Sequence, residues 1–394
     1  MSCAVALALA ACGSGGAEKK ESAYNASEGV PGADAGSFDA PPAEVKEALA
    51  QDAWWYPSMF VDCAASETDA KGCIGEATEG VYNAIPANLV ANDWSVCAVL
   101  PTLSDPYWVA VDYGLTKEAK RLGIGLDVFD AGGYTELSTQ LNQIDDCVAG
   151  GADAIVIGAI SFDGLDAKVD QLEADGIVVI DGLNGISSDK VSARAVLNWK
   201  EMGTMVAEYL KGKGTQEHVA WFPGPPGAGW AEDANAGFEA ALKGSSVTVG
   251  DTKYGDTSKD VQLTLVEDAL QADDKVTAIA GTAVTAEAAV AGGIKNDDIE
   301  IIADYLIPTT YDAIEAGTIS CGVSDHSVVQ ARMTIDMAVR LLEGIPLDDE
   351  KGRAFPAPTL VCGPAAGDAA NLGDFVADST FAPDDFKPVF RVEK

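Results

Sequence analysis

Two acidic and five aromatic residues stand at or near the ends of segments that look like buried strands: Asp105, Tyr107, Trp108, Trp199, Trp230, Tyr305 and Asp325. Aromatic residues make up only 7% of the chain, so this grouping is a concentration. Aromatic faces around a small volume suit an alkylated cationic nitrogen, because the ring quadrupole attracts positive charge and methyl groups carry no N–H donors that must lose water. The two carboxylates would add counter-charge. An N-oxide oxygen would instead need a donor, which a tyrosine hydroxyl or an indole N–H can supply.

Catalytic and metal-binding chemistry has little support in the sequence. The two histidines, His218 and His326, have no serine or cysteine partner in their sequence context, and no CxxC pair is present. His326 follows Asp325 directly, so we expect at most a modest titration of one against the other. The loop 224–229 lacks the Lys-Ser/Thr pair of a Walker A loop, and its prolines remove amide donors that would hold phosphate. We therefore predict no enzymatic activity, no cofactor and no metal.

The composition excludes several classes of partner. The chain has 394 residues with 25 basic and 62 acidic side chains, which gives a formal net charge of −37. Nucleic-acid binding needs basic patches, so this balance argues strongly against it. The hydrophobic share of 47% and the charged share of 22% are sufficient for a large folded core.

The N-terminus resembles the end of a bacterial lipoprotein signal. Residues 4–11 are apolar, and the run Leu9–Cys12 reads as a lipobox, so residues 1–12 are predicted to be a signal with Cys12 as the lipidated residue. Residues 13–40 are rich in Gly, Ser, Ala and Glu, which is typical of a flexible tether. No other segment approaches the roughly 20 apolar residues that a membrane-spanning helix needs.

Six cysteines remain beyond the signal, and an even number in an exported protein favours disulfides. Local order favours the pair Cys63–Cys73. We also predict Cys97–Cys147, which would join the first strand to the end of the second helix, and Cys321–Cys362.

From Trp94 onward, short apolar segments alternate with amphipathic segments, which is the pattern of parallel strand–helix–strand units. In the second amphipathic segment, Leu137, Leu141, Ile144 and Val148 recur at helical spacing. Strands are predicted at residues 95–101, 125–130, 154–159, 177–181, 218–222, 247–253, 278–281, 299–303 and 319–324. Helices are predicted at residues 107–122, around 137–148, 164–174, 200–210, 230–242, 259–271, around 286–292 and 328–342.

This order predicts an α/β protein with two doubly wound, parallel-sheet lobes joined by a hinge of three segments. We assign residues 94–197 and 326–345 to the first lobe, and residues 198–325 and 346–394 to the second. Residues 41–93 form an N-terminal extension, whose aromatic cluster at 54–60 is expected to pack against a lobe or, alternatively, to dock a partner. Ligands of open α/β sheets lie beyond the carboxyl ends of the strands, so loops of both lobes should line one cleft.

The run Cys97–Trp108 resembles the first strand and loop of type I periplasmic solute-binding proteins. Within this family it is most similar to the periplasmic sensors of trimethylamine N-oxide that work with a membrane histidine kinase. Residues 130–134, 197–203, 304–306 and 386–390 carry the same resemblance, which extends from Trp94 to the C-terminus. The lipobox and the long N-terminal extension depart from that branch. The resemblance implies an aromatic ligand site formed by the following residues: Tyr107, Trp108, Trp199 and Tyr305, with Asp105 beside them.

Sugars are the rival ligand class, because other members of this family bind them with planar polar side chains. Compared with ribose-binding proteins, the strand end 157–160 is apolar where a sugar site has Asn, and Asp181-Gly182 lacks the following Arg. Residues 281–283 lack an Asn-Asp pair, and Tyr305 stands where an Asp would be. These losses of hydrogen-bonding groups make a pentose or hexose an improbable ligand.

Together these features predict a lipid-anchored, exported protein in the periplasm or on the outer face of the cell envelope. We expect it to close on a small methylated amine or amine oxide and to present the closed form to a membrane sensor kinase. The alternative is the substrate-binding component of an ABC transporter for a quaternary amine or a sugar, which would dock on a permease.

Overall fold

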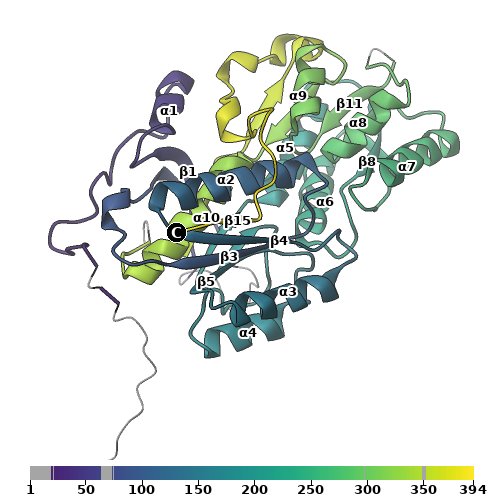
Figure 1. The fold of residues 1–394 in the computed structure, drawn as a ribbon. Coiled ribbons are helices and arrows are strands. Elements are labelled where there is room, and N and C mark those ends of the chain that lie inside the picture. The colour runs from purple at the N-terminus through teal and green to yellow at the C-terminus, as the bar shows by residue number, and fades with distance from the viewer. Residues whose placement is uncertain (1–18, 21, 64–72, 74, 297, 348–351) are drawn as a thin grey trace, which may run out of the picture.

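The computed structural model describes residues 19–20, 22–63, 73, 75–296, 298–347 and 352–394, and it contains two separate sheets (Figure 1). The first sheet contains, from edge to edge, β15 (Arg391–Val392), β4 (Gly125–Asp130), β3 (Ser95–Leu100), β5 (Ala154–Gly158), β6 (Val178–Leu183), β7 (Ala193–Val196), β13 (Gly352–Pro356), β1 (Trp55–Asp62) and β2 (Thr78–Asn83). The second contains β14 (Thr359–Cys362), β12 (Cys321–Ser324), β11 (Glu300–Ala303), β10 (Ala278–Gly281), β8 (His218–Phe222) and β9 (Thr248–Thr252). The predicted two-lobe α/β architecture is confirmed. The predicted signal and Cys12 lie outside the described residues.

Helices cover both faces of each sheet (Figure 1). In the first lobe these are α2 (Pro106–Leu122) and α10 (Ser327–Glu343) on one face, and α3 (Leu137–Ala149) and α4 (Asp166–Ala174) on the other. In the second lobe these are α5 (Trp199–Gly212) and α6 (Gly229–Leu242) on one face, and α7 (Lys259–Ala272), α8 (Ala283–Ala291) and α9 (Pro308–Glu315) on the other. Successive side chains of a strand point to opposite faces of the sheet, so an apolar strand needs helices on both faces. In β3, Val96 and Ala98 pack with α2 and α10, whereas Cys97 and Val99 pack with α3.

The chain crosses between the sheets after β7, after β12 and after β13, which corresponds to the three hinge segments. The C-terminal segment then returns over the surface to add β15 beside β4 (Figure 1). The assignment of all of 346–394 to the second lobe is therefore corrected: β13 pairs with β7 and β1, and β15 with β4, all in the first sheet, and only β14 joins the second. Three 3-10 turns lie along this segment: η3 (Pro364–Ala369), η4 (Leu372–Asp374) and η5 (Ala377–Ser379).

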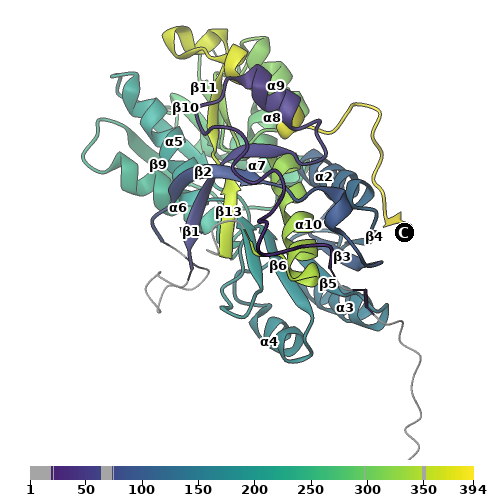
Figure 2. The same ribbon diagram turned by 90° about the vertical axis from the view of Figure 1, so that its left-hand side faces the viewer.

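The N-terminal extension is part of the first lobe. It contains α1 (Pro42–Ala48), η1 (Ala87–Leu89) and the hairpin β1–β2, and β1 pairs antiparallel with β13, so segments from opposite ends of the chain lie side by side (Figure 2). Trp54 and Phe60 are buried, as are Trp55 and Tyr56, and Met59 is half-buried. The cluster packs on the lobe as expected, so these rings are not available to dock a partner.

Three disulfides join the cysteines in the predicted pairs. Cys97–Cys147 ties β3 to α3, Cys321–Cys362 ties β12 to β14, and Cys63–Cys73 lies within the extension. Among the described residues, no helix has the length and apolar character needed to cross a membrane.

Candidate functional site

The first helix of the first lobe places one acid and two aromatic rings at the interlobe cleft. Asp105 is the N-cap of α2, and its carboxylate accepts a hydrogen bond from the backbone N–H of Tyr107 at 2.9 Å. Pro106 occupies the first helical position, where its missing N–H is not needed. This cap fixes Tyr107 and Trp108 in the first turn, where both side chains are buried.

The second lobe supplies the facing rings. Trp199 begins α5, capped by Asn198, and its indole N–H donates to the Leu183 carbonyl of β6 at 2.9 Å, so it bridges the lobes. Trp230 lies in the first turn of α6, and Tyr305 follows β11. These positions are helix starts and a strand end, as the sequence predicted.

The rings form one continuous cluster across the two lobes. The centroids of Tyr107 and Tyr305 are 5.4 Å apart, those of Tyr305 and Trp230 are 6.2 Å apart, and those of Trp230 and Trp199 are 5.4 Å apart. A small cavity beside these rings is lined by Asp105, Tyr107, Trp108, Tyr134, Asn184, Trp199, Trp230, Thr257 and Tyr305. Its volume is about 10 Å³, room for about one water molecule, so a larger guest can enter only if the rings separate.

Three lining residues were not predicted as site residues: Tyr134, Asn184 and Thr257. Tyr134 follows β4, and its ring is 6.1 Å from that of Trp230. The Asn184 amide, just after β6, donates to the Tyr134 hydroxyl at 3.0 Å and to the Ala159 carbonyl at 2.8 Å. The general rule that strand ends line the cleft pointed to these loops, but it did not single out these residues.

Two glycines let backbone approach the rings closely. A Cβ on Gly158, at the end of β5, would lie 2.8 Å from the Trp108 ring. Gly224 has φ +125°, and a Cβ there would overlap the Trp230 ring. A side chain at either position would push an indole ring out of its present place.

Asp325 does not line the cavity; it is fully buried at the end of β12 and faces the Tyr107 hydroxyl from the second lobe. Asp304, at the end of β11, was not predicted as a site residue and is also fully buried. Neither carboxyl makes a side-chain hydrogen bond of good geometry with a described residue. Burial raises the pKa of Asp325 to about 7 and that of Asp105 to about 6, and burial raises the pKa of Asp304 well above its usual value.

The histidines contribute no catalytic arrangement. His218 lies at the edge of the second sheet, where its ring nitrogens contact Asp273 and Thr248. The expectation that His326 titrates against Asp325 is wrong: its Nδ1 faces the hydroxyls of Tyr56 and Ser379, and burial lowers its pKa to about 3. Within the described part of the chain, no group of three or more His, Cys, Asp or Glu side chains could hold a metal ion.

Comparisons with known proteins identify the family of this chain. A model of the periplasmic binding protein domain matches residues 96–346. The periplasmic protein TorT of Escherichia coli K12 is 32% identical over 302 residues, which cover 75% of this chain and 84% of the relative.

Two solved structures are also similar. A solute-binding protein of an ABC transporter from Bradyrhizobium sp. BTAi1, solved with bound bis-tris, is 40% identical with a TM-score of 0.69, covering 85% of this chain and 98% of that one. A structure of the complex between TorT and the TorS sensor domain, solved in the presence of trimethylamine N-oxide, matches at 25% identity with a TM-score of 0.66 and covers 76% of this chain and 100% of that one.

Proposed function

This chain belongs to the periplasmic binding protein family, and from that premise we propose that it closes on a small methylated amine or amine oxide. The observation that carries the proposal is the ring cluster contributed by both lobes, above all Tyr107 facing Tyr305. A guest that contacts rings of both lobes stabilises the closed form, because it binds that form better than the open one. Four aromatic faces at the upper end of about 2 kcal/mol each would correspond to roughly micromolar affinity.

The lining supports an amine more than a sugar. Asn184 is the one carboxamide that lines the cavity, and its N–H groups are already donated to Tyr134 and Ala159. Asp181, the acid that a sugar site would share, is instead buried in an ion pair with Arg194. The guest bound to the Bradyrhizobium protein, bis-tris, is a hydroxylated tertiary amine.

We propose a sensor role as the primary function, in which the liganded form binds the extracytoplasmic domain of a histidine kinase. The relation to TorT, which has been solved together with the TorS sensor domain, supports this role. Delivery to an ABC permease is the second candidate, supported by the 40% identity to a transporter's binding protein. Neighbouring genes separate the two: a kinase and response regulator favour the first, a permease and ATPase the second.

Export and anchoring complete the proposal. We propose that Cys12 is lipidated and holds the protein at the envelope surface, with the ligand site free of enzymatic turnover. Detergent phase partitioning of the expressed protein against its Cys12→Ala variant tests the anchor. Recovery of both proteins in the aqueous phase would contradict the lipid anchor. Chemical conversion of a bound solute would contradict the proposal that the site has no enzymatic turnover.

The ligand class is tested by calorimetry with trimethylamine N-oxide, choline, glycine betaine and ribose in parallel. At least one methylated compound should bind, and Trp108→Ala should weaken that binding by at least about 1 kcal/mol, because one ring face is lost. Phe390→Ala is the control, because this ring is exposed and lies outside the cavity. Tight ribose binding without a response to the methylated compounds would reverse the ligand class.

A further inference from the structure

Three buried carboxyl groups near the cavity have no cationic partner. Asp105 is 6% exposed and Asp304 and Asp325 are fully buried, yet no lysine or arginine of the described residues forms an ion pair with any of them. Burying an unpaired carboxylate is costly, so such groups are kept neutral or paired. The group is drawn from both lobes: Asp105 precedes α2, and the other two follow adjacent strands of the second sheet.

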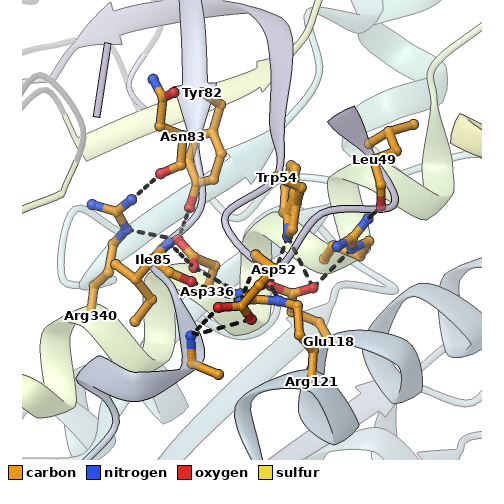
Figure 3. Close-up of polar contacts among 12 residues, drawn as sticks. Leu49, Asp52, Trp54, Tyr82, Asn83, Ile85, Glu118, Arg121, Asp336 and Arg340 are labelled. Atoms are coloured by element: carbon orange, nitrogen blue, oxygen red, sulfur yellow. Dashed lines mark hydrogen bonds and ion pairs between the residues drawn. The ribbon is translucent and has the colours of Figure 1, made fainter. Parts of the chain in front are cut away.

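Other buried carboxylates of this protein have a partner, which is often an arginine, whereas buried Asp112 accepts from the Val389 backbone N–H at 2.7 Å. Asp181 pairs with Arg194 in the first lobe. Under the N-terminal extension, Glu118 pairs with Arg121, and Asp336 pairs with Arg340 (Figure 3). Asp304 and Asp325 differ from these residues, because neither oxygen of either carboxyl has a hydrogen-bond partner of good geometry among the described residues.

The carboxyls are connected to the cavity through the two tyrosines that meet between the lobes. The Tyr305 hydroxyl donates to Asp105 at 3.4 Å, and Asp304 is its chain neighbour. Asp325 faces the hydroxyl of Tyr107. Two buried polar atoms of the lining, the Tyr107 hydroxyl and the Trp230 indole nitrogen, make no hydrogen bond of good geometry with a described residue.

We propose that this site selects a guest with a net positive charge, such as a quaternary ammonium ion, with the three carboxyls as its counter-charge, and that binding releases protons to solvent. The proposal rests on the proposed function and deepens it, because it chooses the cation over the net-neutral amine oxide. On binding, an O–H bond of a carboxylic acid breaks, and a new O–H bond forms on the water molecule that takes the proton. Asp105 lines the cavity and would face the cation directly, whereas Asp325 would act across the Tyr107 hydroxyl.

The surroundings of the three groups support this proton balance. Asp105 faces Tyr305, with Glu287 and Asp256 as more distant acids, and Asp304 faces Asp325. The tyrosines between them stay protonated, because burial raises the pKa of Tyr107 and of Tyr305 well above the usual value. Burial and the neighbouring acids favour the neutral carboxyl, whereas the hydroxyls of Tyr305 and Tyr107 lower the pKa of Asp105 and of Asp325 without outweighing burial. A bound cation would act in the same direction as these hydroxyls and favour the carboxylate.

The direction of the pH dependence follows from the sign of the guest's charge. A cation lowers the carboxyl pKa values on binding, so its affinity should rise with pH up to about 7, the pKa of Asp325 in the empty site. An amine oxide would instead accept a hydrogen bond from a protonated carboxyl, and its affinity should fall over the same range.

The test compares guests of one shape and different charge by calorimetry in phosphate at pH 5.5, 6.5 and 7.5. The guests are choline, its uncharged carbon isostere 3,3-dimethylbutan-1-ol, and trimethylamine N-oxide; amine buffers are avoided because they would compete. Choline should gain about tenfold in affinity per pH unit for each proton released, and the uncharged isostere should show no such gain. A pH-stat titration of unbuffered protein with choline measures the released protons directly.

Each outcome supports or overturns a separate claim. Tight binding of trimethylamine N-oxide that weakens with pH, with choline excluded, overturns the cation inference and leaves the proposed function standing. Binding of none of the methylated compounds overturns the proposed function itself. Choline binding with no proton release overturns the role of the carboxyls.

Two variants test whether Asp325 is a carboxyl that releases a proton when choline binds. Asp325→Asn should lower the number of protons released and weaken choline at least tenfold at pH 7.5. Asp274→Asn, on the exposed surface of the second lobe, makes the same charge change and should leave both quantities unaltered. If Asp325→Asn fails to fold, the proton count of the unaltered protein still decides the inference.

Discussion

The carboxylates under the N-terminal extension and the carboxyls near the interlobe cavity are equally buried but are held in opposite ways. Glu118 accepts from the Trp54 indole at 3.0 Å and from the Arg332 guanidinium at 2.8 Å, and Asp336 pairs with Arg340 (Figure 3). The arginines lower the pKa of Glu118 despite its burial. Near the cavity, burial acts without an arginine and raises the pKa of Asp105 to about 6.

We interpret the paired carboxylates under the extension as part of a fixed interface, and the unpaired carboxyls near the cavity as part of a ligand site. A buried ion pair fixes geometry, and removing one member leaves an uncompensated charge. The network therefore makes the extension a permanent part of the first lobe: Arg332 also donates to the Leu49 carbonyl and lies 4.3 Å from the Trp54 ring. Among the described residues, no ion pair holds the carboxyls near the cavity, so we expect the lobes to separate there more readily than the extension separates from the first lobe.

The largest expected effect comes from carboxyl-to-amide changes in the two regions. Glu118→Gln should cost about 3 kcal/mol or more in free energy of unfolding, because Arg332 and Arg121 lose their buried counter-charge. Asp325→Asn should cost far less and at pH 8 should stabilise the empty protein. Its folded-state pKa lies above the unfolded value, so the penalty of ionising it is absent below about pH 4 and complete above about pH 7.

Urea titrations of both variants at pH 5 and pH 8 measure this contrast. The gain from Asp325→Asn should increase from pH 5 to pH 8, while the loss from Glu118→Gln should persist at both. Equal losses in the two variants at pH 8 would mean that the acids near the cavity are structural as well, and the comparison would fail.

A second prediction tests the packing of the cavity without altering any charge. Gly158→Ala places a methyl group 2.8 Å from the Trp108 ring, so the ring must move toward a cavity of only about 10 Å³. We expect a stability cost of about 1–3 kcal/mol and a loss of roughly tenfold in affinity for a bound methylated amine. Gly373→Ala is the matched control, since nothing lies within 4 Å of its added Cβ. Unchanged affinity in Gly158→Ala would show that Trp108 does not contact the guest.

The sequence predicted those parts of the molecule that strong local patterns determine. The strands at 125–130, 218–222 and 278–281 have the bounds that were predicted from their apolar residues, most of which are buried. β13 and β15 were not recognised as strands of the first sheet. β13 contains Arg353 and is placed by pairing with β1 and β7, and β15 has only two residues.

In the site, too, the sequence predicted what local patterns determine and missed what depends on contacts between distant segments. The aromatic residues could be recognised because they stand near the ends of apolar strand segments, as Tyr107 and Trp108 do after the segment 95–101. The proximity of Asp304 to Asp325 was not predicted, because it depends on which two strands lie next to each other in the second sheet. Which buried acids lack an arginine is likewise a property of the assembled fold and not of any segment.

The smallest expected effect lies at the rim of the extension, where Lys46 of α1 pairs with Asp378 of the C-terminal segment at 3.3 Å. The two side chains are 64% and 57% exposed, so solvent screens their attraction. Lys46→Ala should change the free energy of unfolding by no more than about 0.5 kcal/mol, measured in the same urea titrations as Glu118→Gln. A loss approaching that of Glu118→Gln would mean that the extension is held at its rim rather than by its buried arginines.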